Sequence, residues 1–192
     1  MKKRMLSVFA AAALVLGSYN TNAQDAYKVN SEKSKLEWLS KKVTGQHNGD
    51  IVIKEGVLEL DGSKITGGEF TIDMNTINCT DLTGEYKGKL EGHLKAPDFF
   101  DVTNHATAKF KIKSITADGN VVGDLTIKGI TKEISFPATV KVDGKQVRAE
   151  ANFKIDRTKW DIKYGSGSFF EGLGDKMIYD DIDFTVSLVA AK

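Results

Sequence analysis

The side chains in this sequence best suited to catalysis or metal binding are three histidines and one cysteine, namely His47, His93, His105 and Cys79. The histidines are far apart along the chain, whereas zinc sites normally show closer spacing, such as two histidines four residues apart on a helix. We therefore predict no metal site and no cofactor. Cys79 has no adjacent histidine or glycine-rich elbow to activate it, and we interpret it as a small buried residue.

Two other groups of polar residues have a superficial likeness to catalytic sites. Residues 165–168 resemble a nucleophile elbow in composition, but that motif requires a strand-to-helix turn, so a flexible loop is predicted instead. Asp180, Asp181 and Asp183 are close in sequence. Alternation places Asp181 and Asp183 on the same outer face, which is typical of a solvated edge rather than of an acid/base pair.

The elements that must position these residues follow from a repeated alternation of apolar and polar side chains. Phe136, Ala138 and Val140 alternate with Thr139 and Lys141, for example, which is typical of a β-strand with one buried face. The same pattern predicts eight strands, near residues 35–43, 50–60, 65–74, 109–113, 121–128, 134–142, 147–155 and 182–190. We therefore predict an all-β fold, an antiparallel meander closed into a barrel; about eight strands leave room for one small ligand.

One segment interrupts this alternation. Residues 75–82 are predicted to be irregular, and residues 83–101 to form a helical insertion, because apolar side chains recur there at a spacing of four, at Tyr86, Leu90 and Leu94. Three glycines within the helix each cost up to about 1 kcal/mol relative to alanine. The helix must therefore be stabilised by packing on the rest of the molecule.

The first 23 residues have the organisation of a secretory signal peptide. Three basic residues, Lys2 to Arg4, precede an apolar run that is shorter than the ~20 residues a membrane-spanning helix needs. We expect cleavage after Ala23, leaving residues 24–192 as one domain in the periplasm or outside the cell, without permanent membrane insertion. The formal net charge of the chain is +1, with both signs interspersed. This charge pattern argues against a nucleic-acid partner.

Bulky apolar side chains on the inward positions of the strands are the candidate walls of a cavity. In one interpretation they fill the barrel completely, as in a scaffold protein. Two features favour a cavity: the aromatic part of the insertion can cover one mouth, and residues 164–174 carry two phenylalanines in a glycine-rich loop. The predicted lining comprises Trp38, Phe70, Ile72, Phe99, Phe100, Phe110, Ile112, Leu125, Ile127, Phe136, Phe153, Ile155, Trp160, Phe169, Phe170 and Phe184.

Three ordered motifs resemble those of the YceI-like family of exported lipid-binding proteins. They span residues 92–102, 123–132 and 153–160, and the Trp38 region with the turn at residues 43–49 is similar as well. The resemblance implies a lipocalin-like, eight-stranded antiparallel barrel with a helical insertion. It also implies a polyisoprenoid or another long-chain amphiphile bound in an elongated hydrophobic tunnel.

The function expected from the residues and the resemblance together is non-enzymatic carriage or storage of such a lipid. His47, Lys128 and Arg157 are the candidate partners of its head group, because they are polar residues in or beside strand-end turns. Two alternatives stay open: an enzyme in which His93 or His105 acts as a base on a small apolar substrate, and a stress-related scaffold with a filled core. Whether the protein forms a homodimer is also left open.

Overall fold

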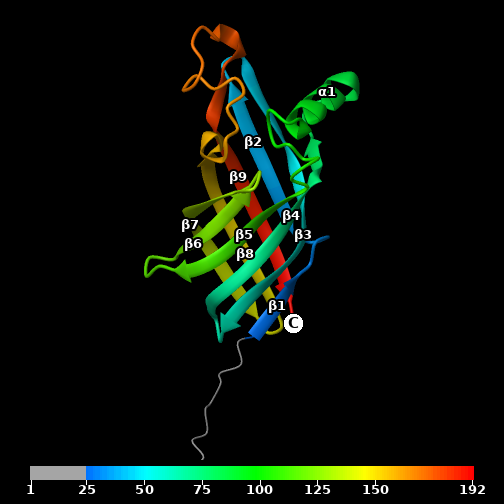
Figure 1. Cartoon of the computed structure of the whole chain (residues 1–192). Coiled ribbons are helices and arrows are strands. Elements are labelled where there is room, and N and C mark those ends of the chain that lie inside the picture. The colour runs from blue at the N-terminus through cyan, green and yellow to red at the C-terminus, as the bar shows by residue number, and fades with distance from the viewer. Residues whose placement is uncertain (1–24) are drawn as a thin grey trace, which may run out of the picture.

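The computed structural model describes residues 25–192, so the predicted signal peptide lies outside the described residues. Within these residues nine strands form one antiparallel sheet in the order β1-β3-β2-β9-β8-β7-β6-β5-β4, and pairing of β3 with β4 closes it into a barrel (Figure 1). The strands are β1 Asp25–Val29, β2 Lys35–Lys42, β3 Gly45–Asp61, β4 Lys64–Cys79, β5 Thr107–Ile115, β6 Asn120–Ile127, β7 Ile130–Asp143, β8 Gln146–Asp156 and β9 Ile178–Ala191. The remaining elements are the helix α1, Gly84–Lys95, and two short 3-10 turns, η1 Arg157–Trp160 and η2 Gly174–Lys176.

The first two strands occupy one position in the barrel wall. Both lie between β3 and β9: β1 pairs with residues 57–60 of β3, and β2 pairs with residues 45–50 of the same strand. Both are antiparallel to β3, so the chain runs in one direction through β1 and β2 with an interruption at residues 30–34. The barrel therefore has eight positions in its wall, which confirms the predicted fold, although the sequence pattern missed β1.

The alternation of apolar and polar side chains along the strands places the apolar ones in the barrel interior, where they form the core. In β6 every second residue is buried, from Val121 to Ile127, and the neighbouring strands repeat this pattern toward the barrel interior. Strand β4 is longer than predicted and continues through residues 75–79, which the sequence indicated to be irregular. A register shift next to Val52 breaks the ladder there, and the Val52 N–H instead donates to the Thr76 hydroxyl at 2.9 Å. This local bulge explains why the alternation is lost in the sequence although the strand persists.

The predicted helical insertion is present, but α1 ends at Lys95 because Pro97 follows. Tyr86 is 73% exposed, so the spacing of four does not mark a buried stripe; Leu94 alone is fully buried. Polar contacts to β4 hold the helix instead: Glu91 accepts from the Cys79 N–H at 2.8 Å, and Lys87 donates to the Asn78 side chain at 2.7 Å. Among residues 25–192 no helix is long and apolar enough to cross a membrane.

The weak helix generates a stability prediction. A methyl group added at Gly88 meets no atom within 4 Å, so Gly88→Ala should raise the free energy of unfolding by about 0.5–1 kcal/mol in urea denaturation. Gly84 is the matched control, because its φ of +58° is unfavourable for alanine although the space around it is equally open. Gly84→Ala should therefore lower stability. Destabilisation by both substitutions would show that α1 is not held as described.

Candidate ligand-binding cavity

The barrel contains a cavity of about 160 Å³. Its walls come from β2 to β9 and from Phe100 of the insertion, and only apolar atoms face this space. No polar group lies inside to orient a substrate by hydrogen bonding. The cavity is therefore built to take an apolar molecule whose binding energy comes from surface removed from water.

Five phenylalanines on five strands form a belt across the middle of the cavity. Phe136 and Phe153 stack with ring centroids 4.3 Å apart. Phe110 lies 5.4 Å from Phe136, and Phe184 lies 5.6 Å from Phe153. Phe70 continues the belt on the far side of Phe110 at 6.5 Å. Each such pair contributes about 0.5–1.5 kcal/mol beyond its area burial, so the belt narrows the cavity and is itself stable.

The structure brings eleven of the sixteen predicted lining residues together in the cavity wall, namely Phe70, Ile72, Phe100, Phe110, Ile112, Leu125, Ile127, Phe136, Phe153, Ile155 and Phe184. The predicted lining omitted other apolar residues that also line the cavity. These include Leu36, Ile53, Met74, Ile134 and Val186. The period-two alternation identifies Met74, Ile134 and Val186, because they share the parity of the phenylalanines on their own strands; Leu36 and Ile53 lie on β2 and β3, which carry no phenylalanine.

Five predicted lining residues do not line the cavity. The Trp38 ring packs over the backbone of Gly49. The Trp160 indole N–H donates to the Leu125 carbonyl at 3.1 Å, which draws the ring to the end of the barrel. Phe99 lies beneath the Arg157 guanidinium, 5.6 Å from it. The last two, Phe169 and Phe170, are each 50% exposed on the surface segment that follows η1.

That surface segment differs from the flexible loop that the sequence predicted for residues 165–168. Ser166 is completely buried, and it bridges to Ile178 at the start of β9. The Ser166 hydroxyl also accepts from the Ser168 N–H at 3.2 Å. The glycine-rich sequence therefore forms a turn that packs against β9. The buried Ser166 hydroxyl accepts a hydrogen bond within that turn.

Arg157, proposed as a head-group partner, is instead a completely buried structural residue. Its guanidinium donates to the carbonyls of Ile162 at 2.7 Å, Ile178 at 3.1 Å and Tyr179 at 3.3 Å, and it lies 3.3 Å from Asp180. Burial lowers the pKa of Arg157, while the charge of Asp180 opposes that shift. The side chain therefore ties η1 to the following turn and to β9, and it has no free donor face for a ligand.

His47 and Lys128, the other two head-group candidates, also lie outside the cavity lining. His47 forms a 2.8 Å contact with Asp81, whose other oxygen accepts from the Asn48 N–H at 3.0 Å and the Cys79 thiol at 3.2 Å. Partial burial raises the pKa of Asp81, but these hydrogen bonds outweigh it and lower the pKa to about 2. Lys128 occupies the β6–β7 turn with a φ of +51°, a conformation that costs energy for a residue other than glycine.

The structure offers no support for a histidine base in the cavity. His93 is packed between the rings of Phe99, at 5.4 Å, and Tyr164, at 4.3 Å. His105 lies 3.9 Å from Asp101 and beside the Gly129 turn. Burial raises the pKa of Cys79, so its thiol is protonated at neutral pH and unsuited to nucleophilic attack. Within residues 25–192 no cluster of three or more histidine, cysteine or acidic side chains is arranged to hold a metal ion.

The Arg157 network yields a prediction about stability rather than ligand affinity. Arg157→Ala leaves three buried carbonyls without their donors and should lower the free energy of unfolding by about 3–5 kcal/mol in urea denaturation. Arg157→Lys should recover only part of this loss, because one ammonium cannot reproduce the planar fork of donors. Lys159→Ala, an exposed change on the same turn, is the control and should shift stability by less than about 0.5 kcal/mol. Equal effects of Arg157→Ala and Lys159→Ala would contradict this role.

Comparisons with known proteins agree with this architecture. A family model described as the YceI-like domain matches residues 27–190. A UPF0312 protein of Pseudomonas fluorescens is 28% identical over 152 residues, covering 76% of this chain and 77% of that protein. A UPF0312 protein of Staphylococcus aureus is 35% identical over 104 residues, covering 50% of this chain and 58% of that protein.

Two solved structures have the same fold. BcnA of Burkholderia cenocepacia superimposes with a TM-score of 0.64 at 23% identity, covering 85% of this chain and 99% of that one. A polyisoprenoid-binding domain of Saccharophagus degradans superimposes with a TM-score of 0.62 at 12% identity, covering 86% of this chain and 97% of that one. These likenesses establish the barrel architecture. Because the family model extends from β1 to the last strand, the chain belongs to the YceI-like family.

Proposed function

We propose that this protein is a non-enzymatic carrier or store for a long-chain isoprenoid or a similar amphiphilic lipid. The observation that carries the proposal is the interior cavity, which presents only apolar atoms and draws its walls from eight strands and Phe100. Each buried methylene of a ligand contributes about 0.8 kcal/mol, so several isoprene units bind strongly without polar contacts. The Saccharophagus degradans domain of the same fold is described as polyisoprenoid-binding, which supports this ligand class.

The location of the protein is part of the same proposal. Residues 1–23 resemble a signal peptide, and their removal would release the barrel into the periplasm or the exterior. There a protein that shields an apolar chain from water would allow that lipid to cross an aqueous space. No nucleic-acid partner or cofactor is required for this activity.

The size of the cavity favours one competing function. A volume of about 160 Å³ is close to that of an engineered protein cavity that takes benzene, and a long isoprenoid exceeds it. A scaffold whose belt of phenylalanines merely fills the barrel would have a similar interior. The two functions differ in whether the protein takes up a long apolar chain from solution.

The proposal predicts that the processed protein binds geranylgeraniol, measured by titration calorimetry in dilute detergent. Phe153→Asp places a charge in the cavity wall and should weaken binding by at least about a hundredfold, because burying an unpaired carboxylate is costly. Ala149→Phe, which fills the cavity with an apolar ring, should also weaken binding while leaving the interior uncharged.

Val52→Asp is the matched control, because Val52 is 43% exposed and does not line the cavity. It should bind geranylgeraniol as the unaltered protein does. Circular dichroism establishes that each variant is folded. Undiminished binding by folded Ala149→Phe, or no binding by the unaltered protein, would contradict the proposal.

A further inference from the structure

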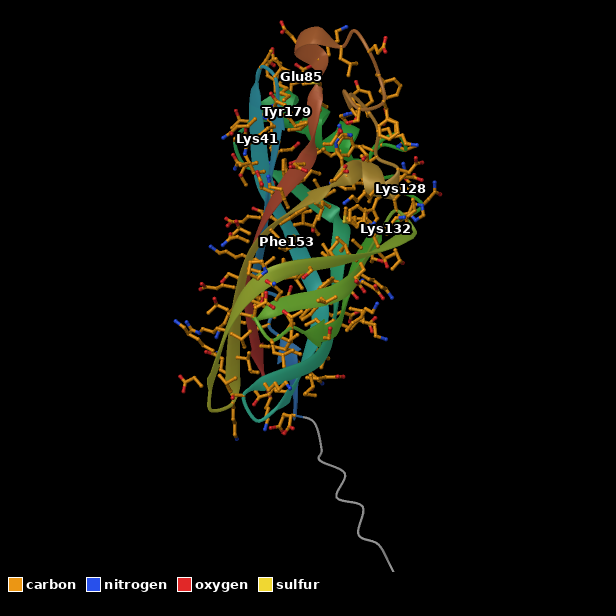
Figure 2. All side chains as sticks on the ribbon, turned by 90° about the vertical axis from the view of Figure 1, so that its left-hand side faces the viewer. Lys41, Glu85, Lys128, Lys132, Phe153 and Tyr179 are labelled. Atoms are coloured by element: carbon orange, nitrogen blue, oxygen red, sulfur yellow. The ribbon has the colours of Figure 1, made fainter. Side chains whose placement is uncertain are left out.

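The hydrogen-bonded ladder between β7 and β8 covers only part of their length. The two strands pair from Asp143 with Gln146 to Ala138 with Ala151, and the pairing stops there. Beyond that point residues 130–137 of β7 pair with β6, while residues 152–156 of β8 pair with β9. We call the unpaired junction between residues 130–137 and 152–156 the β7–β8 window. Figure 2 shows the two strands diverging there, with Phe153 between them.

The β7–β8 window has defined upper and lower limits. The Ala138–Ala151 pair, the last of the ladder, closes its lower limit. The turn η1 packs against β7 at its upper limit, where the Trp160 indole is anchored to the Leu125 carbonyl of β6. The window is therefore a bounded gap in the backbone wall, not a frayed strand end.

Side chains alone close this gap. Phe136 from β7 and Phe153 from β8 stack across it at 4.3 Å with an interplanar angle of 15°. Ile134 and Ile155 are the next inward residues on either side, and all four side chains also line the cavity. Phe153 and Ile134 are partly buried, as are other cavity-lining residues such as Phe110 and Phe184.

Both ends of the barrel are blocked more firmly than the window. At the end that carries the chain's C-terminus, Leu58, Leu60 and Val147 are each at most 1% exposed. At the opposite end Phe100 lies over the cavity, with Trp160 and Ile162 completely or almost completely buried nearby. A chain entering through either end would have to displace this packed core.

Opening the window costs less than separating two strands that are joined by a backbone ladder. Elsewhere, separating two strands breaks backbone hydrogen bonds, each with a net value of about 1 kcal/mol. At the window no β7–β8 ladder exists, so separation loses one aromatic stack, about 0.5–1.5 kcal/mol, plus exposure of apolar surface. An incoming apolar chain replaces much of that lost contact.

We propose that the β7–β8 window is the route by which the lipid chain reaches the interior and the joint at which the barrel widens, with Phe136 and Phe153 as its gate. The inference rests on the proposed lipid binding and explains how a cavity of about 160 Å³ accepts a longer chain. Backbone ladders hold the circumference fixed wherever neighbouring strands are paired. Expansion at the window breaks no β7–β8 backbone pairing.

A cross-link across the window tests this directly. In a Cys79→Ser background, Ser135→Cys and Lys154→Cys introduce exposed thiols on facing edges, which a short bis-maleimide can join. The control pair is Lys141→Cys with Arg148→Cys, exposed residues on the same two strands that are already ladder partners. Uptake of geranylgeraniol is followed by stopped-flow intrinsic fluorescence.

Cross-linking Ser135→Cys to Lys154→Cys should slow uptake at least about tenfold, whereas the control cross-link should change it less than about twofold. Phe153→Leu should raise the rates of uptake and release together, a change that a purely structural role would not produce. Equal uptake rates in the two cross-linked proteins, with geranylgeraniol binding intact, would overturn the proposed entry route but not the proposed function. Absence of binding before any cross-link would overturn the proposed function and the window with it.

Discussion

The structure depends on one constraint, which is that a barrel wall must pair its backbone groups while hiding one face of every strand. Pairing of β3 with β4 closes the ring, and alternate side chains then converge on a shared interior. Because eight wall positions leave more space than aliphatic side chains fill, five phenylalanines narrow the middle. The cavity therefore follows from the pairing of strands around the barrel wall. The side-chain closure of the wall follows from the point at which the β7–β8 pairing stops.

The sequence predicted those parts of the fold that depend on parity. Alternation located eight strands and the inward face of each, so Phe136 and Phe153 were identified as interior residues. Alternation indicates which face of a strand a side chain occupies, but not how far along the barrel axis it lies. The sequence therefore could not show that Trp160 lies outside the cavity wall. Its position depends on a hydrogen bond to Leu125, a residue that is distant in sequence.

Arg157 illustrates a second limit of the sequence. An arginine beside a turn is typically exposed, and nothing local indicates that it is buried. Its burial requires acceptors from two other segments, the carbonyls of Ile162, Ile178 and Tyr179, which only the folded chain brings together. The β7–β8 window was also beyond sequence reasoning, because both strands alternate normally through residues that have no partner across the gap. Strand identity is local, whereas pairing is a property of the whole sheet.

The central claim is that the barrel interior holds an apolar lipid, and native mass spectrometry of protein isolated from its own source organism tests it most directly. The account predicts a bound species in about stoichiometric amount that is released by organic solvent and identified as an isoprenoid or similar long-chain lipid. Protein that is repeatedly isolated without a ligand, and that also refuses added isoprenoids, would contradict the account and favour a filled scaffold.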